Sequence, residues 1–185
     1  LLKTDNSKYT GIAARFAGNG EYILPDVSGN TTTNVTYYNA NNYIDARIVV
    51  NTTVYNRHIN KLCQYVIGKN FWSGKKNILV AGTEEFMYPA LCIGQLFEQK
   101  GKNVKSHSTT RSPVVVSSEK EYPLHVRYEL KSLYNDERTT FLYDIGKYDC
   151  VIIVTDAMYT GKKGINTLIN ALSTKNKEIY VIRWC

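Results

Sequence analysis

The chain alternates between short apolar runs and segments with apolar residues at helical spacing. Continuous runs such as 78–81 (ILVA) and 151–154 (VIIV) are typical of strands that are buried on both faces of a parallel sheet. The predicted strands are 75–82, 102–111, 147–157 and 177–184. The predicted helices are 51–68, 87–101 and 164–176. This alternation predicts an α/β fold: a three-layer sandwich with a mostly parallel, Rossmann-like sheet.

Two segments do not follow this pattern. Residues 1–45 are rich in Gly, Asn, Thr and Tyr and alternate only weakly between polar and apolar positions, which predicts an irregular, β-rich N-terminal cap. The α/β domain is then 46–185. Residues 114–148 form a polar and aromatic excursion for which a strand pair and a short helix are both open.

The net positive charge of the chain favours negatively charged partners. The chain has 23 Lys and Arg against 16 Asp and Glu, a net charge of +7, which favours phosphates, nucleotides or nucleic acid as partners. The basic residues are scattered, so nucleic acid is an unlikely partner. The apolar runs are far shorter than the roughly 20 residues of a membrane span. The four cysteines are far apart and form no C-x-x-C motif, which predicts reduced thiols in a cytoplasmic protein.

Three loops follow predicted strands, at 82–86 (GTEEF), 108–113 (STTRSP) and 155–164 (TDAMYTGKKG). Ligands of open α/β sheets bind beyond the carboxyl ends of the strands. In the last loop, Thr160, Gly161 and Lys162 suit a phosphate group at the start of a helix. Asp156 suits ribose hydroxyls or a Mg²⁺ ion. The alternative is that Asp156 and Thr160 are ordinary turn and capping residues.

The second loop centres on Arg111. Its guanidinium, flanked by Thr109, Thr110 and Ser112, suits bidentate capture of a phosphate or carboxylate. The alternative is that Arg111 pairs with one of three carboxylates and braces the loops. Those carboxylates are Glu84, Glu85 and Asp136.

The first loop carries the candidate catalytic residues. Glu84 and Glu85 are adjacent carboxylates just before a predicted helix. One of them is expected to cap that helix. The other is a candidate general base or Mg²⁺ ligand if Arg111 holds an anion nearby.

The last loop resembles the phosphoribosyl pyrophosphate loop of type I phosphoribosyltransferases, in which an apolar strand, an acid, spacers, Thr and Gly precede a helix. Asp156, Thr160 and Gly161 match that pattern. Thr155 stands where the family has a first acidic residue, and 162–163 (KK) where it has a further hydroxyl. These departures bear on catalysis more than on binding.

A second resemblance rests on GTEEFMYPA, STTRSP and the Tyr-rich segment that ends in DERTTFLYD. Together they resemble the TRSP domain, over roughly 45–183. This resemblance implies a domain that accompanies predicted orotate-type phosphoribosyltransferases in bacterial tellurium-resistance and stress gene clusters.

Two functions are therefore expected. The first is binding, with conversion left open, of a phosphorylated ribose or nucleotide in the synthesis of a nucleotide derivative linked to stress response, with Mg²⁺ as cofactor. If the domain is an enzyme, it is a phosphoribosyltransferase-like transferase. The alternative is a non-catalytic regulatory or docking domain for a phosphoribosyltransferase.

Overall fold

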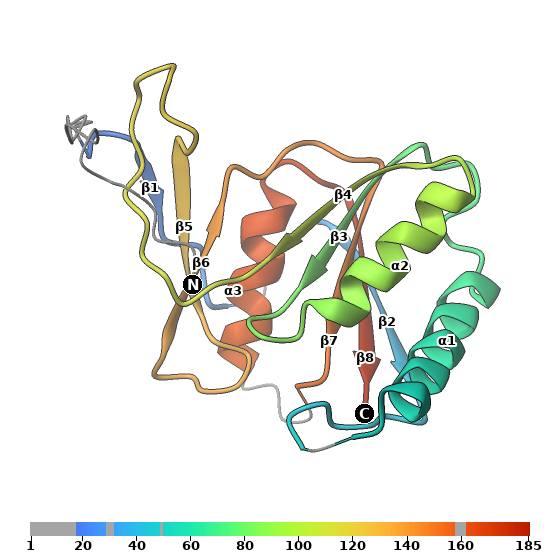
Figure 1. Cartoon of the computed structure of the whole chain (residues 1–185). Coiled ribbons are helices and arrows are strands. Elements are labelled where there is room, and N and C mark those ends of the chain that lie inside the picture. Colours follow the sequence, from blue (N-terminus) through green and yellow to red (C-terminus); the bar gives the residue numbers. More distant parts are fainter. Residues whose placement is uncertain (1–17, 29–31, 49, 158–161) are drawn as a thin grey trace, which may run out of the picture.

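The computed structural model describes residues 18–28, 32–48, 50–157 and 162–185. A five-stranded parallel sheet forms its centre (Figure 1). The strands, in their order across the sheet, are β2 (Asn34–Ala40), β8 (Glu178–Trp184), β7 (Cys150–Thr155), β3 (Asn77–Gly82) and β4 (Asn103–Ser108). Every residue of β7 is buried, as expected for the middle strand of a sheet covered on both faces.

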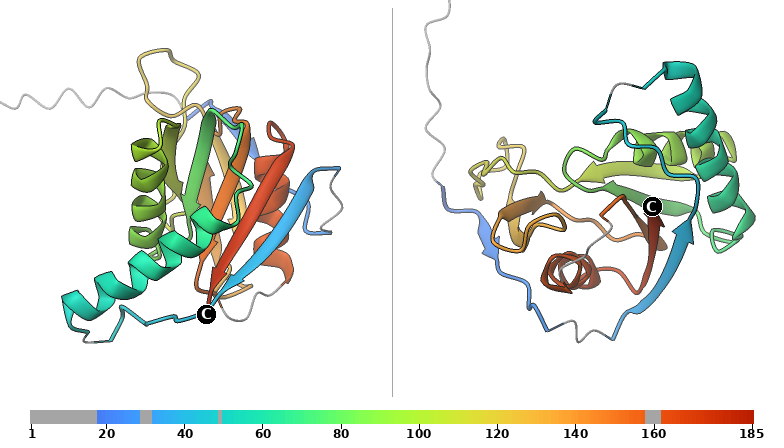
Figure 2. Two further views of the ribbon diagram at one scale, coloured as in Figure 1. Left: turned by 90° about the vertical axis from the view of Figure 1, so that its right-hand side faces the viewer. Right: turned by 90° about the horizontal axis from the view of Figure 1, so that it is seen from below.

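Helices cover both faces of this sheet (Figure 2). On one face lie α1 (Thr52–Gly68) and α2 (Tyr88–Gln99), whose buried residues share a core with side chains of β3 and β7. On the other face lies α3 (Lys162–Ser173), together with a small sheet. That sheet has the order β1 (Glu21–Ile23), β5 (Val126–Lys131) and β6 (Thr139–Tyr143). The predicted three-layer α/β sandwich is therefore confirmed.

The helix starts have local causes in the sequence. Asn51 caps α1, because its side-chain oxygen accepts hydrogen bonds from the backbone N–H groups of Thr53 and Val54, at 2.9 and 3.3 Å. Pro89 lies in the first turn of α2, where its missing N–H costs nothing. The helix α3 begins at Lys162, two residues before the predicted start.

The described part of the N-terminal segment, which was predicted as an irregular, β-rich cap, contains two strands. β1 pairs in parallel with β5, and β2 pairs in parallel with β8 at the edge of the main sheet. Because an edge strand is only half buried, the weak alternation along 34–40 is what such a strand requires. For residues 114–148 a strand pair and a short helix were both open. The structure has the strand pair, since β5 and β6 are antiparallel neighbours.

The five parallel strands end at one edge of the sheet, so the loops that follow β3, β4 and β7 meet there. The turn after β3 is tight. A Cβ at Gly82 would lie 2.7 Å from the Phe86 carbonyl oxygen, and Glu84 has a left-handed backbone with φ of 51°. In the described residues no helix combines the length and the apolar character that crossing a membrane requires.

Candidate functional site

Asp156 lies directly after β7, and its side chain is only 1% exposed. Its Oδ2 accepts a hydrogen bond from the Tyr43 hydroxyl at 2.9 Å, and its Oδ1 accepts one from the Tyr134 hydroxyl at 2.6 Å. The Arg47 guanidinium donates to both oxygens, with 3.3 Å between Nη2 and Oδ1. Both carboxylate oxygens are therefore engaged by side chains of the protein.

These contacts fix the protonation states. Burial alone would raise the pKa of Asp156, but hydrogen bonds from Arg47, Tyr134 and Tyr43 outweigh it and hold the pKa below its usual value. Burial, followed by the bond to Asp156, raises the pKa of both tyrosines, so they remain donors at neutral pH. The site thus contains an ionised Asp156 that faces a charged Arg47.

A chain of hydrogen-bonded hydroxyl groups connects Tyr134, and through it Asp156, to Thr83 and Thr155. The Thr83 hydroxyl lies 2.8 Å from that of Tyr134 and donates to the Thr155 hydroxyl at 2.9 Å. Thr155, which stands where the phosphoribosyltransferase loop has an acid, is fully buried. We call these six residues the Asp156 cluster: Tyr43, Arg47, Thr83, Tyr134, Thr155 and Asp156.

The Asp156 cluster is a poor fit for Mg²⁺ as it stands. Hard cations require free oxygen ligands, whereas the Asp156 oxygens already accept from a cation and two hydroxyls. Within the described ranges, no group of three or more His, Cys, Asp or Glu side chains lies close enough to hold a metal ion. A Mg²⁺ ion on Asp156 requires Arg47 to move away.

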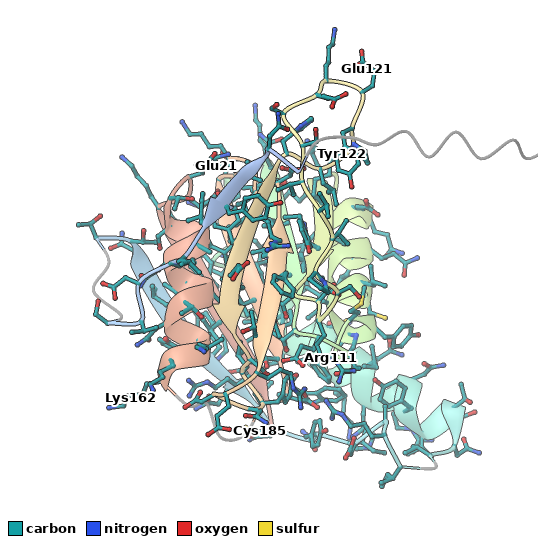
Figure 3. All side chains as sticks on the ribbon, turned by 90° about the vertical axis from the view of Figure 1, so that its left-hand side faces the viewer. Glu21, Arg111, Glu121, Tyr122, Lys162 and Cys185 are labelled. Carbon is teal, nitrogen blue, oxygen red and sulfur yellow. The ribbon has the colours of Figure 1, made fainter. Side chains whose placement is uncertain are left out.

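A second site lies beside this cluster, between the turn after β3 and the chain that leaves β4. It is a cleft of about 280 Å³ lined by Glu84, Glu85, Met87, Ser108, Thr109, Thr110, Arg111 and Ser112. We call it the Arg111 cleft. Figure 3 shows Arg111 at the same edge of the molecule as Lys162 and Cys185, which is the edge where the parallel strands end. Six of the residues that the sequence analysis selected therefore lie together.

The two adjacent glutamates of the Arg111 cleft point in different directions. Glu85 forms an ion pair with Arg111, and both side chains are about half exposed, at 54% and 55%. The Glu84 side chain is 2% exposed, accepts from Arg138 at 3.0 Å, and accepts from the Ser132 hydroxyl. The left-handed backbone of Glu84 separates the two carboxylates. One of the alternatives for Arg111, pairing with a nearby glutamate, is thus present.

The expectation that one of these glutamates caps the next helix is wrong. The residue at the cap of α2 is Met87, and no side chain caps that helix. Pro89 removes one of the N–H groups that a cap would satisfy. Both glutamates are engaged by arginines instead.

The other predicted site residues differ in exposure and in whether their side chains already form hydrogen bonds within the protein. The buried Thr109 hydroxyl accepts from the Glu84 N–H at 3.0 Å, and the Thr110 hydroxyl accepts from the Ser112 N–H at 3.2 Å. Lys162 is exposed at the first position of α3. Two further predicted residues, Thr160 and Gly161, lie outside the described residues.

The sequence analysis missed five partners of these carboxylates: Tyr43, Arg47, Ser132, Tyr134 and Arg138. Arg47 is 109 positions from Asp156 and belongs to the chain that follows β2. Arg138 is 54 positions from Glu84 and lies in the turn between β5 and β6. A basic residue in a polar loop carries no signal for its distant partner, so neither pair is visible in the sequence.

The cysteines are free thiols, as predicted. Burial raises the pKa of Cys63 and of Cys150 to about 12. These two thiols therefore remain protonated at neutral pH and are not nucleophiles.

The family model described as "TRSP domain C terminus to PRTase_2" matches residues 50–172. This chain belongs to the TRSP domain family. The matched region includes the Arg111 cleft and Asp156, and the family description makes the role of the TRSP domain one associated with a phosphoribosyltransferase. Tyr43 and Arg47 precede the match, so partners of Asp156 come from outside it. The curated proteins contain no match to the chain.

Proposed function

We propose that this TRSP domain binds a phosphorylated ribose or nucleotide in the Arg111 cleft, in the service of a phosphoribosyltransferase. The observation that carries the proposal is the state of Arg111: a half-exposed guanidinium in a hydroxyl-lined cleft at the carboxyl edge of a parallel sheet. This edge is where α/β sheets bind ligands.

The chemistry of Arg111 suits a phosphate. A guanidinium presents a planar fork of N–H donors that binds two phosphate oxygens at once. Its present partner, Glu85, is equally exposed, and an exposed ion pair contributes little stability. A ligand phosphate can therefore replace Glu85 at small cost. Hydroxyls such as that of Ser112 are at hand for ribose.

The remaining predicted contacts belong to this proposal. Lys162, with Thr160 and Gly161, would hold a second phosphate at the start of α3. Asp156 would bind ribose or Mg²⁺ only after Arg47 leaves it. A Mg²⁺ ion that is held by the oxygens of a diphosphate ligand would not need Asp156 as a ligand, so Arg47 could stay in place. Synthesis of a nucleotide derivative in a stress response is part of the proposal on the strength of the sequence resemblance.

Binding is better supported than conversion. A general base needs a carboxylate that is free to take a proton. Glu84 is buried against Arg138 and Ser132, while Glu85 becomes free only when a ligand takes its place on Arg111, and it is then an exposed carboxylate. These contacts favour a domain that holds a ligand over a transferase.

Ligand binding is tested by thermal unfolding and calorimetry with phosphoribosyl pyrophosphate and Mg²⁺, and with nucleoside monophosphates. A ligand at 100 times its dissociation constant adds about 2.7 kcal/mol to the free energy of unfolding. Arg111→Gln is expected to remove this gain. The matched control is Arg57→Gln, which removes the same charge from an exposed position on α1. An equal gain in Arg111→Gln, or none in the wild type, would contradict the proposal.

One observation favours a second function. Asp156 is saturated by Arg47, Tyr43 and Tyr134, which suits a structural residue in a domain that docks on a phosphoribosyltransferase without binding its ligands. Sedimentation of the domain with a phosphoribosyltransferase domain of the partner family tests this. Complex formation that is unchanged in Arg111→Gln, in a protein that binds none of the phosphates above, would favour docking.

A further inference from the structure

A groove of about 260 Å³ runs between α1 and α2, on the face that these helices turn away from the sheet. It is lined by Asn56, Ile59, Asn60, Cys63, Gln64, Tyr88, Cys92, Gln95, Leu96 and Gln99. Half of these residues are carboxamides, and none carries a charge. We call it the amide groove. It is separate from the Arg111 cleft and from the Asp156 cluster, and its role does not depend on the proposed function.

The amides of this groove are available for a ligand. Asn56 accepts only a long hydrogen bond, 3.5 Å, from the Tyr88 hydroxyl. Asn60, Gln64, Gln95 and Gln99 are exposed, and their side chains make no hydrogen bond within the described part of the chain. Each carboxamide offers both an acceptor oxygen and donor N–H groups, the same pair that a peptide group offers.

The spacing of the amides matches an extended peptide. Asn56, Asn60 and Gln64 follow each other at intervals of four along α1, and Gln95 and Gln99 do so along α2. Four residues of helix rise about 6 Å. Two residues of an extended chain rise about 6.6 Å. Successive amides on one helix can therefore meet every second peptide group of a strand laid along the groove.

The floor of the groove is apolar. Ile59 and Cys63 are buried, while Cys92 and Leu96 are half buried. Because side chains of an extended chain alternate in direction, every second one would point at this floor while the peptide groups face the amides. The absence of charged lining residues disfavours a charged ligand, which would gain nothing here in exchange for its lost hydration.

We propose that the amide groove binds an extended, uncharged polypeptide segment of about four residues through main-chain hydrogen bonds. The footprint follows from the amide row: Asn56 to Gln64 spans about 12 Å of helix, the length of roughly four extended residues. Such a site would recognise the peptide backbone and small apolar side chains. The Arg111 cleft, with its exposed guanidinium, would instead recognise a negative charge.

The test uses a displayed library of random heptapeptides selected on the folded domain. The enriched peptides are then synthesised with acetylated and amidated ends. We expect enrichment of sequences with an uncharged core of about four residues. Upon binding, the side-chain amide signals of Asn60 and Gln95 should shift in nuclear magnetic resonance spectra, and the bound peptide should show the short sequential contacts of an extended chain.

The decisive variant is Asn60→Asp with Gln95→Glu, which removes donors while keeping size at two exposed positions. It is expected to weaken binding about tenfold or more, since each lost hydrogen bond costs several-fold in affinity. The matched control, Asn39→Asp, changes an exposed amide on β2 and should bind like the wild type. The proposal is overturned if no peptide is enriched, if the double variant binds as well as the control, or if the peptide binds as a helix.

Discussion

Two arginine–carboxylate pairs at the same edge of the sheet have arginines of similar exposure, 47% and 55%, but carboxylates in opposite surroundings. Arg47 holds an Asp156 side chain that is 1% exposed and has two tyrosine hydroxyls as further donors. Arg111 holds a Glu85 side chain that is 54% exposed, and the two are side by side in an open cleft. The first pair stabilises the fold of the edge, because removing Arg47 would leave the buried Asp156 carboxylate without its cation. The second contributes little to the fold and is therefore free to exchange partners.

The largest expected effect is the loss of the buried carboxylate. Asp156→Ala leaves Arg47 and two tyrosine hydroxyls without their acceptor, and we expect it to lower the free energy of unfolding by about 3 kcal/mol, roughly 1 kcal/mol for each of the three donors. Urea denaturation measures this. The matched control is Asp45→Ala, because Asp45 pairs with the same Arg47 at 3.3 Å but is 37% exposed. That control should cost less than about 1 kcal/mol. An equal decrease in the free energy of unfolding in the two variants would show that the buried carboxylate contributes no more to stability than the exposed one.

A smaller effect is expected from the tyrosine that joins the Asp156 cluster to Thr83. Tyr134→Phe removes a hydroxyl that donates to Asp156 and lies 2.8 Å from that of Thr83. The free energy of unfolding should fall by about 1.5 kcal/mol. Tyr22→Phe removes a hydroxyl from an exposed tyrosine and should change it by less than about 0.5 kcal/mol. A Tyr134→Phe protein as stable as Tyr22→Phe would show that the cluster does not depend on this link.

Acid should weaken the buried pair. The pKa of Asp156 is depressed in the folded state, so its contribution to stability is present above the unfolded pKa, about 3.9, and is lost as pH falls below it. We therefore expect the stability difference between wild type and Asp156→Asn to shrink by on the order of 1 kcal/mol as pH falls from 6 towards 3. Urea titrations of both proteins across this range measure it. A difference that stays constant with pH would mean that Asp156 has the same pKa in the folded and unfolded chain.

The smallest expected effect on stability is at the exposed pair. Glu85→Gln should change the free energy of unfolding by less than about 0.5 kcal/mol. It should instead strengthen phosphate binding several-fold, because Arg111 loses its internal competitor. Calorimetry with phosphoribosyl pyrophosphate compares it with Glu98→Gln, an exposed glutamate on α2. Weaker binding in Glu85→Gln than in that control would show that Glu85 contributes to the ligand site directly.

The elements around β3, β7 and α2 could be predicted because their signal is local. Buried parallel strands are continuous apolar runs, and Pro89 marks a helix start whatever its tertiary neighbours are. The place of β2 could not be predicted, because a half-exposed edge strand resembles an irregular polar segment until its neighbour is known.

The location of the candidate site could be predicted, but its hydrogen bonds and ion pairs could not. Strand ends and polar loops placed Arg111, Glu85 and Asp156 at one edge of the sheet, and the structure has them there. Which carboxylate faces inward depends on the left-handed backbone at Glu84 and on arginines from distant loops. Those contacts exist only after the chain has folded, so no local pattern reports them.

The order of strands also has a consequence for biosynthesis. Among the described strands β8 comes last in the sequence, yet it lies between β2 and β7 in the sheet and is the sheet neighbour of β2. While the ribosome is still making 178–184, β2 has no strand to pair with and β7 has an open edge. Pairing between such distant segments is slow and leaves apolar surface exposed in the meantime. The main sheet therefore stays open between β2 and β7 until β8 has been synthesised.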